Sequence, residues 1–172
     1  MLILFALSIA LLAAILAAFS DFQRLKIPNI LPILILISFF CSFAVYPEVF
    51  SDVWWKPFAA MGVTFIVTFI MFSVGMMGGG DSKLMVALAP WVGWTGLIPY
   101  IFIMTLVGGV LGGIALWVKK NKPFSSPDPK SWIGQVQDGR SAVPYGIAIT
   151  VGAIATMLLT GFIQEKFNIV LM

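Results

Sequence analysis

The chain has 172 residues, of which 60% are hydrophobic and 10% are charged, and its formal net charge is +3. Its mean hydropathy of +1.05 excludes an ordinary soluble domain and indicates a protein embedded in a membrane. The chain contains no histidine, which excludes Ser-His and Cys-His catalysis, a histidine-ligated zinc protease and a histidine proton relay within it. Its single cysteine, Cys41, lies in an apolar run and is expected to be a packing residue.

The apolar runs predict an all-α transmembrane bundle of about six spans, because roughly 20 apolar residues of helix cross the hydrocarbon core. In chain order the expected spans are Leu2–Ser20, Ile30–Tyr46, Phe58–Gly75, Leu84–Trp94, Leu97–Val118 and Ala142–Ile163. The fourth span carries Pro90 and is expected to be short or kinked. We interpret residues 1–172 as one transmembrane domain, with a cytoplasmic loop at 119–141 that contains a short amphipathic piece around Trp132–Val136.

The basic residues predict an N-terminus outside the cell. With that orientation the cytoplasmic loops hold Arg24, Lys26, Lys83, Lys119, Lys120, Lys122, Lys130 and Arg140, and the other side holds Lys56 and Lys166. Two aspartates that end or begin apolar runs, Asp21 and Asp81, then lie at the same cytoplasmic face. The positive charge is thereby explained by topology, and no nucleic-acid partner is expected.

Two further patterns predict packing. Tryptophans near the outer ends of the expected spans should anchor the protein at the lipid interface: Trp54, Trp55, Trp91 and Trp94. Glycines on the fifth span form two overlapping small-xxx-small pairs: Gly108, Gly109, Gly112 and Gly113. This glycine face is expected to pack inside the monomer, with a homodimer as the less favoured use.

Asp81 follows three glycines in the run Met77-Gly78-Gly79-Gly80-Asp81-Ser82-Lys83. Glycines permit unusual backbone conformations and let another backbone approach, so an extended substrate could lie beside the Asp81 carboxylate. The alternative is that Asp81 caps the N-terminus of the next helix.

Asp21 has an alternative role as well, because Arg24 is placed to form a helical ion pair with it. Pro28 then breaks the helix, and Asn29 could cap the one that follows.

Together the two carboxylates indicate catalysis. Two carboxylates that share a site do not both ionise at low cost, so one retains a proton near neutral pH. The ionised partner can deprotonate a water while the protonated one polarises a peptide carbonyl. Hydrolysis by this route needs no metal, cofactor, cysteine or histidine. Asp21 and Asp81 are therefore the candidate catalytic pair of an aspartic endopeptidase.

These residues resemble the type IV prepilin peptidases, the aspartic enzymes of bacterial pilus assembly. Gly78-Gly79-Gly80-Asp81-Ser82-Lys83 fits their GxGDxK motif, Asp21 ahead of Ile27-Pro28-Asn29 fits the first motif, and Val143–Ile149 is similar to their Pro-Tyr/Phe-Gly segment. The resemblance implies that Asp21 and Asp81 are catalytic and that Gly78 and Gly80 form the loop that presents Asp81. Lys83, Asn29 and Gly146 belong to these motifs and are given structural roles.

The resemblance also implies a substrate and a location. Longer members carry paired CxxC motifs and a methyltransferase activity, neither of which the single cysteine supports, so zinc binding and N-methylation are not expected. A short, peptidase-only chain is similar to the enzymes of Flp-type tight-adherence (Tad) pili. Such an enzyme lies in the bacterial inner membrane and cuts the basic leader from a prepilin at the cytoplasmic boundary. Asp128 and Asp138 are candidate contacts for that leader.

Two alternatives remain. A presenilin-type intramembrane protease shares GxGD, although its other aspartate lies in a Tyr-Asp motif within a span, whereas Asp21 follows Ser20 at a boundary. A small membrane transporter, or an assembly subunit of a pilus or secretion system, could instead use the carboxylates for cations or helix packing. The expected spans carry no midplane charge and show no evident repeat, which disfavours the transporter.

Overall fold

The computed structural model describes residues 2–50, 53–140 and 143–162, and within these ranges the chain is helical with no strand. The α-helices are α1 (Leu2–Arg24), α2 (Ile30–Val45), α3 (Lys56–Ser73), α4 (Gly79–Val92), α5 (Leu97–Asn121), α6 (Trp132–Gln137) and α7 (Tyr145–Leu159), with a short 3-10 helix at Pro47–Val49. The predicted all-α class is confirmed. The outer ends of the last expected span, Ala142 and Ile163, lie outside the described residues.

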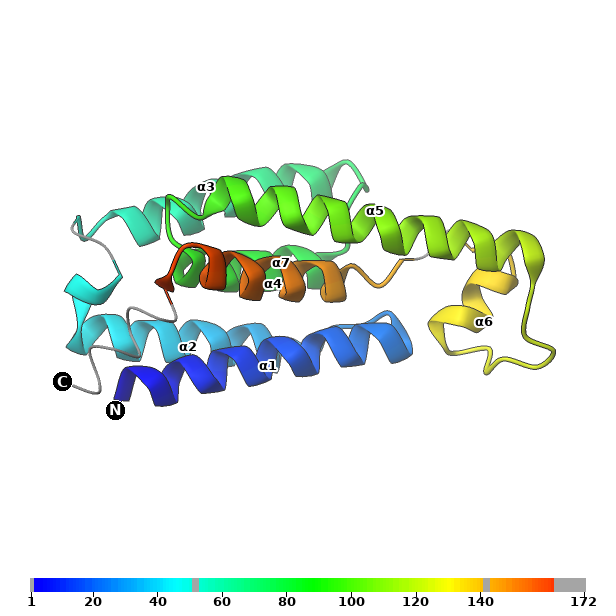
Figure 1. Ribbon diagram of the computed structural model, residues 1–172, viewed down its shortest axis with the longest axis horizontal. Helices are drawn as coiled ribbons and strands as arrows, with labels where there is room; N and C mark the ends of the chain where they lie inside the picture. Colours follow the sequence, from blue (N-terminus) through cyan, green and yellow to red (C-terminus); the bar gives the residue numbers. More distant parts are fainter. Residues whose placement is uncertain (1, 51–52, 141–142, 163–172) are drawn as a thin grey trace.

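The long helices form an elongated bundle, and α6 lies beyond one end of it (Figure 1). Helix α1 packs against α2 and α7, α5 packs against α7, and α3 packs against α4. Among the described residues, α1, α3 and α5 are long and apolar enough to cross a membrane, and α2 and α7 are shorter apolar helices. The chain is therefore a helical membrane protein, while the count of six spans and the orientation stay predictions.

Small side chains face the inside of the bundle on α1, and large apolar ones face outward. The buried face includes Ala6, Ala10, Ala13, Ala14 and Ala17. The exposed face carries Phe5, Leu12, Ile15, Leu16 and Phe19. This is the arrangement of a membrane bundle, in which small residues let helices approach and large apolar ones contact lipid. The Thr150 hydroxyl of α7 accordingly reaches the Ala14 carbonyl oxygen of α1, at 3.0 Å.

The predicted interfacial role of the tryptophans is wrong for Trp91. Its side chain is fully buried, and its indole N–H donates to the Ile35 carbonyl oxygen of α2 at 3.2 Å. Trp55 and Trp94 remain exposed, with their ring centroids 6.5 Å apart.

The fourth and fifth helices are separate, because Gly93 adopts a φ of 76° and ends α4. The expected short, proline-containing helix is thus the observed α4, with Pro90 inside it.

Candidate active site

Asp21 lies in the last turn of α1 and is 5% exposed. Its Oδ2 accepts a hydrogen bond of 2.8 Å from the backbone N–H of Gly146, in the first turn of α7. A Cβ at position 146 would lie 3.0 Å from this Oδ2, so the close approach depends on glycine. Asp21 therefore turns toward α7, and among the described residues no ion pair joins it to Arg24, the alternative that their spacing allowed.

Asp81 lies in the first turn of α4, while Gly78 occupies the N-cap position. Asp81 is therefore not the N-cap residue itself, but its carboxylate still accepts a hydrogen bond from the backbone N–H of Gly78 at the start of the helix. A Cβ at Gly78 would lie 2.8 Å from the Asp81 carboxylate, and a Cβ at Gly80 would lie 3.2 Å from that of Ile27. Gly78 thus leaves room for the Asp81 carboxylate, and Gly80 leaves room for Ile27 in the segment that follows α1.

One cavity of about 750 Å³ is lined by both Asp21 and Asp81. The two residues are distant in sequence and come from different helices, so tertiary packing brings them together. The glycine face of α5 also lines this cavity: Gly108, Gly109, Gly112 and Gly113. Gly108 packs on the Tyr145 ring, as expected for packing inside the monomer, whereas a Cβ at Gly109, Gly112 or Gly113 would meet nothing within 4 Å. The remaining glycines thus leave open space beside the carboxylates.

The environment of Asp81 favours its protonated form. Asp81 precedes the apolar part of α4, at the same end of the bundle as the last turn of α1. Burial, and secondly the nearby Asp21 carboxylate, raise the pKa of Asp81 to about 7. Lys119 and Arg140 line the same cavity and supply positive charge to it. The site therefore contains a carboxyl group that exchanges its proton near neutral pH, which suits general acid–base chemistry.

Further residues support the site and were not assigned to it from the sequence. The Lys83 ammonium donates to the Asn29 side-chain oxygen at 3.0 Å, which joins α4 to the start of α2. Asn29 occupies the N-cap position of α2 as expected, but its side chain makes no capping bond. The Ser20 hydroxyl, one residue before Asp21, donates to the Lys26 carbonyl oxygen at 2.8 Å. The only sequence signal for Lys83, Asn29 and Gly146 is their place in the motifs.

Comparisons with known proteins agree on one family. The model of the type IV leader peptidase family matches residues 7–113, a range that includes both aspartates. A segment of 43 residues is 54% identical to the prepilin leader peptidase/N-methyltransferase of Xanthomonas campestris pv. campestris and covers 25% of this chain and 15% of that protein. An 82-residue segment is 34% identical to the protein of the same name from Aeromonas salmonicida. This segment covers 48% of this chain and 28% of that protein.

The matched segments thus span 15% and 28% of the lengths of these relatives. No solved structure matches the chain. The family model nevertheless covers well over half of the 172 residues and includes the whole cavity-lining part of α1 and α4. The chain therefore belongs to the type IV leader peptidase family.

Proposed function

We propose that this protein is a membrane aspartic endopeptidase that removes the basic leader from prepilins of the Flp type at the cytoplasmic boundary of the bacterial inner membrane. The observation that carries the proposal is that Asp21 of α1 and Asp81 of α4 line one cavity. Family membership supports leader cleavage as the reaction. The proposal covers the peptidase only, because the matched segments span a small part of relatives whose name also includes a methyltransferase.

In the proposed reaction the pair shares one proton at the start. The ionised carboxylate takes a proton from water, and the water oxygen forms a bond to the peptide carbonyl carbon. The protonated carboxyl hydrogen-bonds to the carbonyl oxygen, where negative charge develops. The carbon–nitrogen bond then breaks, and the leaving nitrogen takes a proton from the pair. A pKa near 7 for Asp81 lets it give and recover this proton at neutral pH.

Gly78 and Gly80 have a presenting role in this proposal. A Cβ at position 78 would collide with the Asp81 carboxylate, at 2.8 Å, and a Cβ at position 80 would crowd the Ile27 side chain, at 3.2 Å. The Gly146 N–H holds the Asp21 carboxylate through its hydrogen bond of 2.8 Å. Both carboxylates thus accept a hydrogen bond from the backbone of a glycine that lies close to them, which favours a fixed geometry for the catalytic pair.

The substrate would be a membrane helix that diffuses in the plane of the bilayer. The open glycines of α5 would let its backbone pass close to the carboxylates, since small residues permit near approach of helices. The scissile bond would lie at the depth of Asp21 and Asp81, and the basic leader would stay on the side that holds most lysines and arginines of the chain.

The test is prepilin processing in cells that lack other prepilin peptidases. A candidate prepilin is co-expressed with the wild type, Asp21→Asn or Asp81→Asn, and its mature N-terminus is read by mass spectrometry. Cleavage ahead of the hydrophobic helix with the wild type alone is the expected result. Full processing by either variant would refute the aspartic mechanism. Cleavage inside the hydrophobic helix would point instead to an intramembrane protease.

A further inference from the structure

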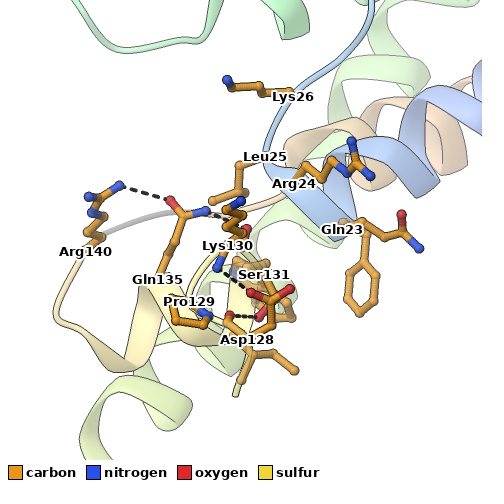
Figure 2. A pocket seen from close by; sticks show the side chains of 13 residues that line it. Gln23, Arg24, Leu25, Lys26, Asp128, Pro129, Lys130, Ser131, Gln135 and Arg140 are labelled. Atoms are coloured by element: carbon orange, nitrogen blue, oxygen red, sulfur yellow. Dashed lines mark hydrogen bonds between the residues drawn. The ribbon is translucent and has the colours of Figure 1, made fainter. Parts of the chain in front are cut away.

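A second cavity, of about 1050 Å³, lies between the end of α1 and the loop that carries α6. It is lined by residues of two segments, 22–26 and 128–140. Figure 2 shows the side chains of Arg24, Lys26, Lys130 and Arg140 around it. We call this cavity, defined by these four side chains, the basic pocket. It adjoins the cavity of the two aspartates, because Leu25 and Arg140 line both.

The basic pocket has an excess of positive charge that the described residues do not neutralise. Asp128 is its one carboxylate, and Asp128 Oδ1 accepts the backbone N–H of Lys130 at 2.9 Å. Within the ranges that the structure describes, none of the four basic side chains has a carboxylate at ion-pair distance. Arg140 donates to the neutral amide oxygen of Gln135, at 3.3 Å. The pocket thus presents three net positive charges to whatever enters it.

The position of the basic pocket relates it to the membrane surface. Arg24 lies four residues after Ser20, at which the apolar run of α1 ends, so the pocket begins within about one helical turn of that end. Phe22 lines the pocket, is 41% exposed and packs on the Trp132 ring with centroids 5.6 Å apart. An exposed aromatic ring beside arginine and lysine is typical of the boundary between hydrocarbon and headgroups.

We propose that the basic pocket binds a phosphate group, supplied by the headgroup of an anionic phospholipid. Basic recesses beside membrane helices are suited to such headgroups, because arginine and lysine pair with phosphate oxygens while the acyl chains stay in the hydrocarbon layer. A bound phosphate would also offset the positive field that Arg140 extends into the neighbouring cavity. The Asp128 carboxylate also accepts the backbone N–H of Lys130 within its own loop, and its predicted contact with a basic leader stays a prediction.

The proposal is tested by lipid binding, which does not require peptide cleavage. The full chain, purified in neutral detergent, is titrated with phosphatidylglycerol or phosphatidylcholine, and retained lipid is measured by native mass spectrometry. The wild type should retain phosphatidylglycerol preferentially. The Lys26→Gln/Lys130→Gln variant should bind it about 25-fold more weakly, at roughly fivefold for each cation removed.

The matched control is Lys120→Gln/Lys122→Gln, which removes the same charge from residues that line neither cavity. It should bind phosphatidylglycerol as the wild type does. Equal losses in both double variants, or equal retention of the two lipids by the wild type, would overturn the proposal. Competition by millimolar inorganic phosphate would assign the pocket to free phosphate and overturn the lipid source.

An Asp21→Asn arm separates this inference from the proposed function. Asp21 does not line the basic pocket, so the variant should retain phosphatidylglycerol normally whatever its effect on cleavage. Loss of cleavage with normal lipid retention would therefore support both proposals independently. A wild type that retains the anionic lipid but cleaves no prepilin would count against the proposed function alone.

Discussion

Replacement of Gly146 by alanine is expected to slow prepilin cleavage by about 10- to 150-fold. The new Cβ would lie 3.0 Å from both Cβ and Oδ2 of Asp21, so the carboxylate must shift and its 2.8 Å bond to the residue 146 N–H must weaken. A hydrogen bond to a charged group contributes about 1.5–3 kcal/mol. Each increase of about 1.4 kcal/mol in the activation free energy slows a reaction about tenfold. If the bond to Asp21 is lost in the transition state, cleavage therefore slows by about 10- to 150-fold.

Gly152→Ala is the matched control for this variant. Gly152 lies on the same helix, α7, and its Cβ would come within 3.0 Å of the Met104 Cβ, away from Asp21. Both substitutions overpack α7 and should each lower the free energy of unfolding by about 1–3 kcal/mol. Values of kcat/KM on a synthetic prepilin and thermal unfolding are measured for both. The reasoning is refuted if Gly146→Ala cleaves like the wild type, or if Gly152→Ala is slowed as much.

Three further predictions concern the surroundings of the site. The pKa of Asp81 is raised to about 7 in the folded protein, so the folded state binds more protons there than the unfolded chain. Thermal stability should therefore fall as the pH rises from about 5 to 8, and Asp81→Asn should flatten that decline; an unchanged slope would contradict this. Lys83→Met and Asn29→Ala should each slow cleavage about two- to fivefold, and the double variant no further, because both remove the same 3.0 Å bond; additive losses in a double-mutant cycle would argue against a shared role. Trp91→Phe should lower the free energy of unfolding by about 1–2 kcal/mol, measured by denaturant titration in detergent, because the bond to the Ile35 carbonyl is lost; equal stability would show that bond to be unimportant.

The helices were predictable because apolar length and helix-breaking residues act locally. The expected span Ile30–Tyr46 corresponds to α2, Ile30–Val45. Helix α1 runs on to Arg24, since the end of an apolar run marks a change of solvent and does not by itself break hydrogen bonds along the helix. The burial of Trp91 was not predictable, because closeness to the end of a span does not say which face of the helix meets other helices.

The two aspartates could be proposed as a pair because each is costly near lipid and their motifs are recognisable. Their partners could not be predicted from the residues. The bond between Gly146 and Asp21 joins residues 125 apart in the sequence and depends on how α7 packs on α1. The bond between Lys83 and Asn29 likewise depends on the packing of α4 beside α2. Such contacts follow from tertiary structure, which local sequence patterns do not specify.

The central claim is that Asp21 and Asp81 act together to hydrolyse a peptide bond. It is tested most directly with the purified chain in lipid nanodiscs, a synthetic prepilin and water enriched in heavy oxygen. The wild type should release a leader that carries one heavy oxygen atom in its new carboxyl group. Asp21→Asn and Asp81→Asn should each cleave at least about 10²-fold more slowly while unfolding at the wild-type temperature or above. Cleavage at the wild-type rate by either folded variant would contradict the account.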